Sequence, residues 1–108
     1  MAENLDLIDK KISIKRLEKI QIQKRLKGII NVELFGATCD LIKLKKIAYK
    51  NNLTLIGDCA QSLGTKFKNK STISYYDYSF TSFYPTKVLS CYGDGGAVFL
   101  KKNLNIIS

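Results

Sequence analysis

The feature that most constrains the fold is a strand–helix–strand pattern between residues 28 and 57. Residues 28–35 (GIINVELF) are apolar and rich in β-branched side chains, which predicts a buried strand. Asp40 can cap a helix over residues 41–50, in which apolar side chains recur at helical spacing. Residues 53–57 (LTLIG) predict a second strand. Because one crossover helix joins the two strands, we expect a βαβ unit with parallel neighbouring strands.

Further strands are predicted in the second half of the chain. Residues 76–83 alternate aromatic and small side chains, which is a strand pattern, and residues 96–100 (GAVFL) follow a glycine-rich turn. Residues 64–68 predict a short strand, followed by a turn at residues 69–71. The chain is therefore predicted to be α/β, with a mixed but mostly parallel sheet and flanking helices.

The first 27 residues form a basic segment that we predict to be partly helical, separate from the unit over residues 28–108. Eight of the 18 Lys and Arg residues lie between Lys10 and Lys27, and the formal net charge of the chain is +9. Such an excess is one signature of nucleic-acid binding, but charge alone is a weak signal. A basic nucleic-acid-binding protein is kept as an alternative.

The composition limits the chemistry that the chain can perform. With 108 residues it fits one domain at most, and without histidine it cannot form a histidine-based triad. Its three cysteines are odd in number and form no C-x-x-C pair, which argues against a disulfide framework and a zinc site, so no metal is predicted. The chain has no apolar run of the roughly 20 residues that cross a bilayer, and no secretion signal. We therefore expect a cytoplasmic protein without a membrane partner.

Polar side chains follow two of the predicted strands. Asp58 comes directly after one strand, and Ser82 and Lys87 lie at and just after the end of another. In open α/β sheets, ligand-binding groups gather at the carboxyl ends of the strands. These residues could therefore converge at one edge of one sheet, although this pattern by itself names no ligand.

Two stretches make the sequence recognisable: LIGDCAQSLGTKFKNK (residues 55–70) and YSFTSFYPTKVLSCYGDGGAVFL (residues 78–100). Together with IINVELFGATCDLIKLKKIAYKNNL before them, they resemble the DegT/StrS-type sugar aminotransferases, enzymes of the aspartate-aminotransferase fold that use pyridoxal 5′-phosphate. Several ordered motifs at suitable spacing make the resemblance specific. It implies that residues 28–108 are a fragment of the cofactor-binding large domain of a fold-type I pyridoxal-phosphate enzyme.

The resemblance implies roles for four residues. Lys87 stands at the family's Schiff-base lysine and is the candidate catalytic residue, and Asp58 stands at the partner of the pyridine nitrogen. Gln61 matches the residue that contacts the ring's phenolic oxygen, and Ser82 matches the serine that binds the cofactor phosphate. Pro85 has a fixed φ and would help to hold the turn that aims Lys87. Each residue also has an ordinary alternative role, as a solvated lysine, a turn aspartate or a polar loop side chain.

The resemblance also implies a reaction and its partners. The family moves an amino group from glutamate or glutamine onto a nucleotide-linked keto-sugar, for amino-sugar or surface-polysaccharide synthesis. Its members are homodimers in which the partner subunit completes each active site. The lysine at position 87 favours an aminotransferase over the related sugar dehydratases, in which a histidine replaces it.

The chain is much shorter than the members of this family. We therefore expect weak cofactor binding and doubtful activity from the isolated chain, and a non-catalytic remnant or a split-gene subunit that needs a partner chain is an alternative. Four residues depart from the family pattern. Asn31 stands where proline is usual, and Glu33 where histidine is usual. Gly57 stands where glutamate is common, and Val88 where asparagine is common.

Overall fold

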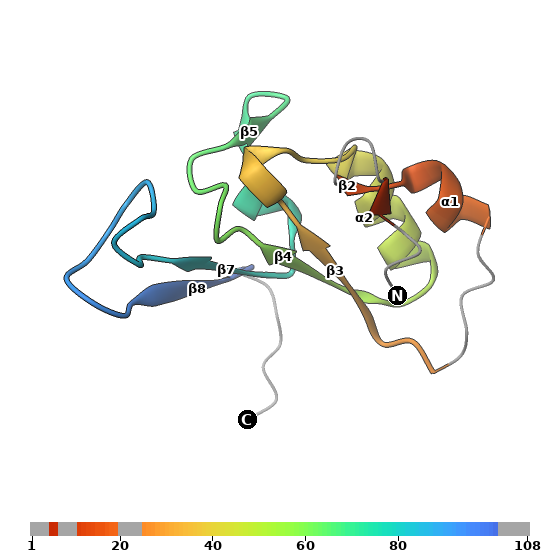
Figure 1. The fold of residues 1–108 in the computed structure, drawn as a ribbon. Helices are drawn as coiled ribbons and strands as arrows, with labels where there is room; N and C mark the ends of the chain where they lie inside the picture. Colours follow the sequence, from red (N-terminus) through yellow and green to blue (C-terminus); the bar gives the residue numbers. More distant parts are fainter. Residues whose placement is uncertain (1–4, 7–10, 20–24, 102–108) are drawn as a thin grey trace.

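A four-stranded sheet forms the centre of the structure, a computed structural model that describes residues 5–6, 11–19 and 25–101 (Figure 1). The strands follow one another across the sheet in the order β3 (Gly28–Val32), β4 (Thr54–Asp58), β7 (Tyr78–Ser82) and β8 (Gly96–Leu100). β4 pairs in parallel with both β3 and β7, whereas β8 pairs antiparallel with β7. The predicted α/β class with a mixed, mostly parallel sheet is confirmed.

The remaining elements are short, and α1, α2 and β5 lie on one side of the central sheet (Figure 1). Their bounds are β1 Leu5–Asp6, β2 Lys11–Ile12, α1 Ile14–Lys19, the 3₁₀ turn η2 Leu34–Gly36, α2 Leu41–Lys50, β5 Lys66–Phe67, β6 Lys70–Ser71 and the 3₁₀ turn η3 Thr72–Tyr75. β1 pairs with β2, and β5 pairs with β6, each in antiparallel fashion. None of the helices in the described part of the chain is long and apolar enough to cross a membrane.

Helix α2 forms over the residues that the sequence predicts. The Asp40 carboxylate accepts a hydrogen bond from the Lys43 N–H at 3.1 Å, which caps the first turn. Leu41, Leu44 and Ala48 recur at helical spacing and are buried in the core between the helix and the sheet. The strand–helix–strand unit is thus held together by an apolar seam along one face of α2.

Within the described residues, only one face of the central sheet is covered by other elements. The side chains on the face toward α2 are buried, among them Ile29, Asn31, Leu55, Ser79 and Thr81. Large apolar side chains on the opposite face are exposed, among them Ile30 at 59%, Val98 at 69% and Leu100 at 54%. The buried strand predicted from the apolar run is therefore buried on one face only.

The strand predicted over residues 28–35 is too long. β3 ends at Val32, and the next residue, Glu33, whose side chain is fully buried, leaves the extended conformation with φ of −88° and ψ of 71°. The chain then forms η2, in which Phe35 has a left-handed conformation with φ of 54°. A residue with this φ cannot continue a strand.

The turn predicted at residues 69–71 lies earlier in the structure, at residues 68–69. Lys68 and Asn69, with φ of 48° and 63°, form the two-residue turn of the β5–β6 hairpin. Two successive residues with positive φ are typical of a tight hairpin turn whose twist matches that of its strands. The strand predicted over residues 64–68 is correspondingly shorter and begins at Lys66.

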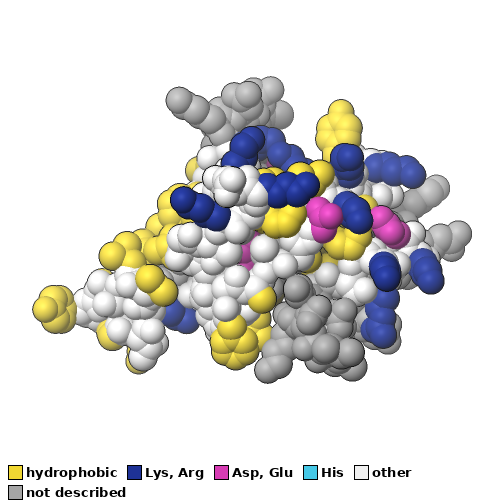
Figure 2. Space-filling model, turned by 90° about the horizontal axis from the view of Figure 1, so that it is seen from above, with side chains coloured by type: hydrophobic (Ala, Val, Ile, Leu, Met, Phe, Trp, Pro, Cys, Tyr) yellow, Lys and Arg dark blue, Asp and Glu magenta, His cyan; other side chains and the backbone are white. Residues whose placement is uncertain are grey.

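Figure 2 views the molecule from the side on which α1 and α2 lie. Lys and Arg side chains are spread over this face, with acidic side chains between them. A nucleic-acid site would instead gather them into a stripe or patch. On this face the described basic side chains do not form a single stripe, and a nucleic-acid partner stays an untested alternative.

We expect Leu44→Ala to destabilise the fold, because Leu44 is fully buried between α2 and the sheet. Removing a buried leucine leaves a cavity and costs about 2–5 kcal/mol in free energy of unfolding. Lys46→Ala, on the exposed side of the same helix, is the matched control and should change this free energy by no more than about 0.5 kcal/mol. Urea unfolding followed by circular dichroism measures both, and equal effects would contradict the packing described.

Candidate active site

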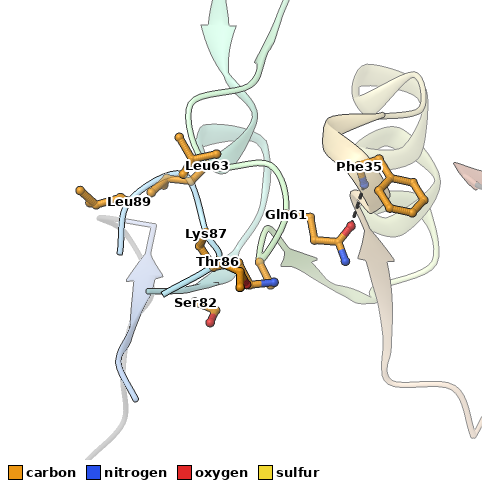
Figure 3. Close-up of a pocket in the computed structure, with 9 residues that line it drawn as sticks. Phe35, Gln61, Leu63, Ser82, Thr86, Lys87 and Leu89 are labelled. Atoms are coloured by element: carbon orange, nitrogen blue, oxygen red, sulfur yellow. Dashed lines mark hydrogen bonds between the residues drawn. The ribbon is translucent and has the colours of Figure 1, made fainter. Parts of the chain in front are cut away.

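A pocket of about 430 Å³ lies where the carboxyl ends of β4 and β7 meet the loop after β7 (Figure 3). This volume falls within the usual range for small-molecule sites. The lining residues are Phe35, Ala60, Gln61, Leu63, Ser82, Thr86, Lys87, Val88 and Leu89. The pocket therefore contains three of the four residues to which the sequence assigns a cofactor role.

Lys87 is presented by a tight turn in the loop after β7. Its backbone N–H donates to the carbonyl of Tyr84 at 2.8 Å, which closes a four-residue turn with Pro85 in the second position. Proline is favoured there because its fixed φ matches the turn. The side chain of Lys87 is half-buried and lines the pocket. The proline thus holds the turn from which the lysine enters the site.

The base of this loop is closed by two main-chain hydrogen bonds, both of which involve Phe83. The Phe83 N–H donates to the Gly95 carbonyl at 2.7 Å, and the Phe83 carbonyl accepts from the Cys91 N–H at 2.7 Å. Gly93 has φ of 123°, a conformation that residues with a Cβ rarely adopt. The glycine-rich segment before β8 therefore serves to close the loop that carries Lys87.

Ser82 is the last residue of β7, and its hydroxyl stands at the start of the loop. Its Oγ accepts a hydrogen bond from the Tyr84 N–H at 3.2 Å. Since a hydroxyl can accept and donate at the same time, its O–H group can still donate a hydrogen bond to a ligand. The Ser82 side chain lines the same pocket as that of Lys87, which comes five residues later in the sequence.

Asp58 ends β4 but is not among the residues that line this pocket. It pairs with Val32 on one side and Phe80 on the other, so its side chain lies on the uncovered face of the sheet. Ser82 is two residues beyond Phe80 on β7 and therefore lies on the same face. The Asp58 carboxylate accepts a hydrogen bond from the Ala60 N–H at 3.1 Å, which fixes the turn that follows.

Gln61 is oriented by a residue from a distant part of the chain. Its Oε1 accepts a hydrogen bond from the Phe35 N–H at 2.9 Å, as the dashed line in Figure 3 marks. Only the oxygen of an amide can accept, so this bond fixes which end of the side chain carries the NH₂ group. Gln61 therefore offers hydrogen-bond donors on the side of its amide turned away from Phe35.

The carboxyl ends of β4 and β7 are joined by hydrogen bonds at Cys59. The Cys59 N–H donates to the Phe80 carbonyl at 2.9 Å, and the Thr81 hydroxyl donates to the Cys59 carbonyl at 3.1 Å. The thiol is fully buried, and burial together with the nearby Glu33 carboxylate raises the pKa of Cys59 to about 12. Cys59 is thus a packing residue beneath the site, and its thiol stays protonated at neutral pH.

The sequence reasoning missed two residues that contribute to the pocket. Thr86 lies directly between Pro85 and Lys87 and lines the cavity. Its position in the motif, next to Lys87, is the sequence signal that indicates a place in the pocket. Phe35 is 26 residues from Gln61, and its part in the site depends on a left-handed backbone that apolar patterning does not reveal.

Apolar side chains on the loop beside the pocket are exposed to solvent. They are Tyr84 at 51%, Val88 at 87%, Leu89 at 57% and Tyr92, which is fully exposed. In Figure 2, yellow side chains project at the left end of the molecule, where Figure 1 places this loop. Exposed apolar groups gathered at a site indicate a surface that another polypeptide or a ligand covers.

The fold is shared with part of several solved α/β aminotransferases. An aminotransferase from Brucella abortus has a similar structure, with a TM-score of 0.78 and 34% sequence identity, over 90% of this chain and 28% of that chain. NtdA from Bacillus subtilis, solved with bound cofactor PMP, gives a TM-score of 0.74 and 28% identity, over 83% of this chain and 20% of that one.

The chain belongs to the DegT/DnrJ/EryC1/StrS aminotransferase family, whose family model matches residues 5–105. This match begins well before residue 28, so it includes part of the basic segment, and the division of the chain at residue 27 stays a prediction. A related sequence is the UDP-2-acetamido-2-deoxy-3-oxo-D-glucuronate aminotransferase of Pseudomonas aeruginosa, 42% identical over 84 residues. That match covers 78% of this chain and 23% of the relative, so the chain spans about a quarter of the relative's length.

The burial of Cys59 predicts a large difference in reactivity between two thiols. With the pKa of Cys59 raised to about 12, its thiolate fraction at pH 8 is about a thousandfold below that of an ordinary cysteine. Cys91 is only partly buried and should be alkylated first. Iodoacetamide labelling followed by mass spectrometry checks this order, with the urea-unfolded chain as control. Equal labelling rates in the folded chain would contradict the buried position of Cys59.

Proposed function

We propose that this chain supplies the cofactor-binding part of an aminotransferase that uses pyridoxal 5′-phosphate. The observation that carries the proposal is the position of Lys87 in one pocket with Gln61 and Ser82, in a chain of an aminotransferase family. A lysine amine that forms a covalent bond to the cofactor aldehyde is a requirement of this chemistry. PMP, the cofactor bound to NtdA, is the aminated form of the same molecule.

The donors and the size of the pocket fit this cofactor. A volume of about 430 Å³ accommodates a small aromatic phosphate, and Leu63 supplies an apolar wall. The Ser82 hydroxyl can donate to a phosphate oxygen, because the bond from the Tyr84 N–H uses only an acceptor lone pair and leaves the O–H group available. The amide of Gln61 can donate to the phenolic oxygen of the ring. When bound, the cofactor supplies an electron sink for the amino-group transfer.

The remaining chemistry falls to two residues of this chain. Lys87 would hold the cofactor through Nζ and, once released, carry a proton between the substrate carbon and the cofactor carbon. Asp58, at the end of β4, would keep the pyridine nitrogen protonated through its carboxylate. Asp58 and Ser82 lie on the same face of the sheet, which supports binding of one molecule across the ends of β4 and β7.

The substrate that we propose is a nucleotide-linked keto-sugar, with glutamate or glutamine as the amino donor. The name of the Pseudomonas aeruginosa relative, which specifies a UDP-linked 3-oxo sugar, supports this substrate class. The donor and a homodimeric assembly rest on the resemblance to the family. The exposed apolar side chains of Tyr84 and Tyr92 beside the pocket support a second subunit at this position.

A second candidate is a subunit that acts only with a complementary chain. The uncovered sheet face favours it, because Ile30, Val98 and Leu100 leave a row of apolar side chains in water. Such a face is normally buried by further polypeptide. In this case the cofactor would bind tightly only after the complementary segment has joined the sheet.

We expect pyridoxal 5′-phosphate to become attached to Lys87. Borohydride reduction should fix the adduct, and peptide mass spectrometry should locate it. Lys87→Ala should reduce the adduct at least about tenfold, because Lys87 is the only lysine of the described residues that lines this pocket. Lys46→Ala, an exposed lysine on α2, is the matched control and should label as the parent chain does.

The same experiment distinguishes the two candidates. Labelling that depends on Lys87 in the isolated chain supports a site that this chain forms by itself. Labelling that requires a second polypeptide, comprising the remaining part of the Pseudomonas aeruginosa relative, supports the complementary-chain candidate. Equal labelling of the parent chain and Lys87→Ala under both conditions would refute the proposed cofactor role.

A further inference from the structure

Tyr76 lies at the centre of a buried polar network beneath the candidate site. Its side chain is 2% exposed, and its hydroxyl group has two partners from the end of β3. The hydroxyl donates to Glu33 Oε1 at 2.6 Å and accepts from Asn31 Nδ2 at 2.7 Å. Burial and the Glu33 carboxylate raise the pKa of Tyr76, so the hydroxyl keeps the proton that it donates.

Glu33 is a fully buried carboxylate whose hydrogen-bond donors are hydroxyl groups. Besides Tyr76, it accepts from Thr72 Oγ1 at 2.9 Å and from Thr38 Oγ1 at 3.2 Å. A buried carboxylate is very unfavourable unless its oxygens are hydrogen-bonded, so each donor matters. Tyr76 makes the shortest of the three bonds and is the donor most distant in sequence from Glu33, at 43 residues.

Asn31, Glu33 and Gly57 all lie around Tyr76. Asn31 and Glu33 bind its hydroxyl, and Gly57 lies against its ring. A Cβ atom at position 57 would be 2.4 Å from Cδ2 of the Tyr76 ring, closer than any real contact. Only glycine at position 57 therefore leaves room for the Tyr76 ring.

The network is joined to the candidate site through η2. The backbone N–H of Glu33 donates to the Asp58 carbonyl at 3.0 Å. Two residues further on, Phe35 takes its left-handed conformation and donates its N–H to Gln61 at 2.9 Å. A left-handed non-glycine residue persists only where the neighbouring chain holds it. In this structure the side chain of Glu33 anchors the segment that leads into it.

We propose that Tyr76 is a positioning residue, which holds Glu33 and η2 so that the Phe35 N–H orients the amide of Gln61 toward the pocket. Tyr76 is hydrogen-bonded to Glu33, the main chain leads from Glu33 to Phe35 two residues on, and Phe35 is hydrogen-bonded to Gln61. The inference rests on the proposed function only for the identity of the ligand that Gln61 meets. The positioning itself can be tested in the chain without a ligand.

Amide hydrogen exchange in Tyr76→Phe tests the proposal by NMR. Tyr76→Phe keeps the ring beside Gly57 and removes only the hydroxyl group. Hydrogen bonds to a buried charged group stabilise enough that their loss should speed local exchange about tenfold or more. We expect this acceleration at the amides of Phe35 and Ala37, together with a shift of the Gln61 side-chain NH₂ resonances.

Tyr75→Phe is the matched control, since it removes a neighbouring hydroxyl that binds the Phe67 carbonyl at 3.0 Å, away from Glu33. It should leave the Phe35 amide unchanged. The Leu44 amide lies in the first turn of α2, a different element, and its exchange through local opening should change much less than that of Phe35 in Tyr76→Phe. An equal acceleration at Leu44 and Phe35, or no change at Phe35, would overturn the positioning role.

Thr72→Val provides a second test if Tyr76→Phe does not fold. It removes another donor to Glu33 with little change in shape, and we expect a smaller acceleration at the same two amides. Unchanged exchange at these amides would count against the network as the anchor of η2.

Titration with pyridoxal 5′-phosphate then separates this proposal from the proposed function. If both are correct, Tyr76→Phe weakens binding several-fold relative to Tyr75→Phe. If the parent chain binds no cofactor but the exchange pattern is as expected, the proposed function fails and the positioning of Gln61 stands. If the cofactor binds equally to both variants and exchange is unchanged, the positioning role is refuted while the proposed function stands.

Discussion

The parallel pairing of β4 with both of its neighbours is the constraint on which the rest of the structure depends. Because β3, β4 and β7 run in the same direction, their carboxyl ends meet at one edge of the sheet. Asp58 and Ser82 are the last residues of β4 and β7, and Gln61 and Lys87 follow them within a few residues. The pairing of the strands therefore brings the site residues together, although they come from segments that are far apart in the sequence.

The carboxyl edge is held by polar contacts as well as by the ladder of strand pairs. Thr81 and Cys59 join β7 to β4, while the backbone of Glu33 joins β3 to β4. The buried carboxylate of Glu33 adds contacts to η3 and to Tyr76, from a different part of the chain. A charge with several hydroxyl donors stabilises one arrangement of these segments, because any other arrangement leaves the charge buried without partners.

The two faces of the sheet have different roles. One face packs against α2 and provides the apolar core of the described chain. The other carries Asp58 and Ser82 among exposed apolar side chains. The chain spans about a quarter of its relative's length, and sheets with parallel strands are normally covered on both faces.

The sequence by itself determined the local elements and the identity of the candidate residues. The cap at Asp40 and the apolar spacing predicted α2 to the residue, and the SFYPTK motif predicted the turn that holds Lys87. These features depend on neighbours a few positions apart, which a sequence displays directly. Only the tertiary structure decided that one sheet face is bare, that Phe35 is left-handed and orients Gln61, and that Tyr76 binds Glu33. The last two features arise from contacts between residues 26 and 43 positions apart, where the packing of other elements sets the distance and no local pattern records it.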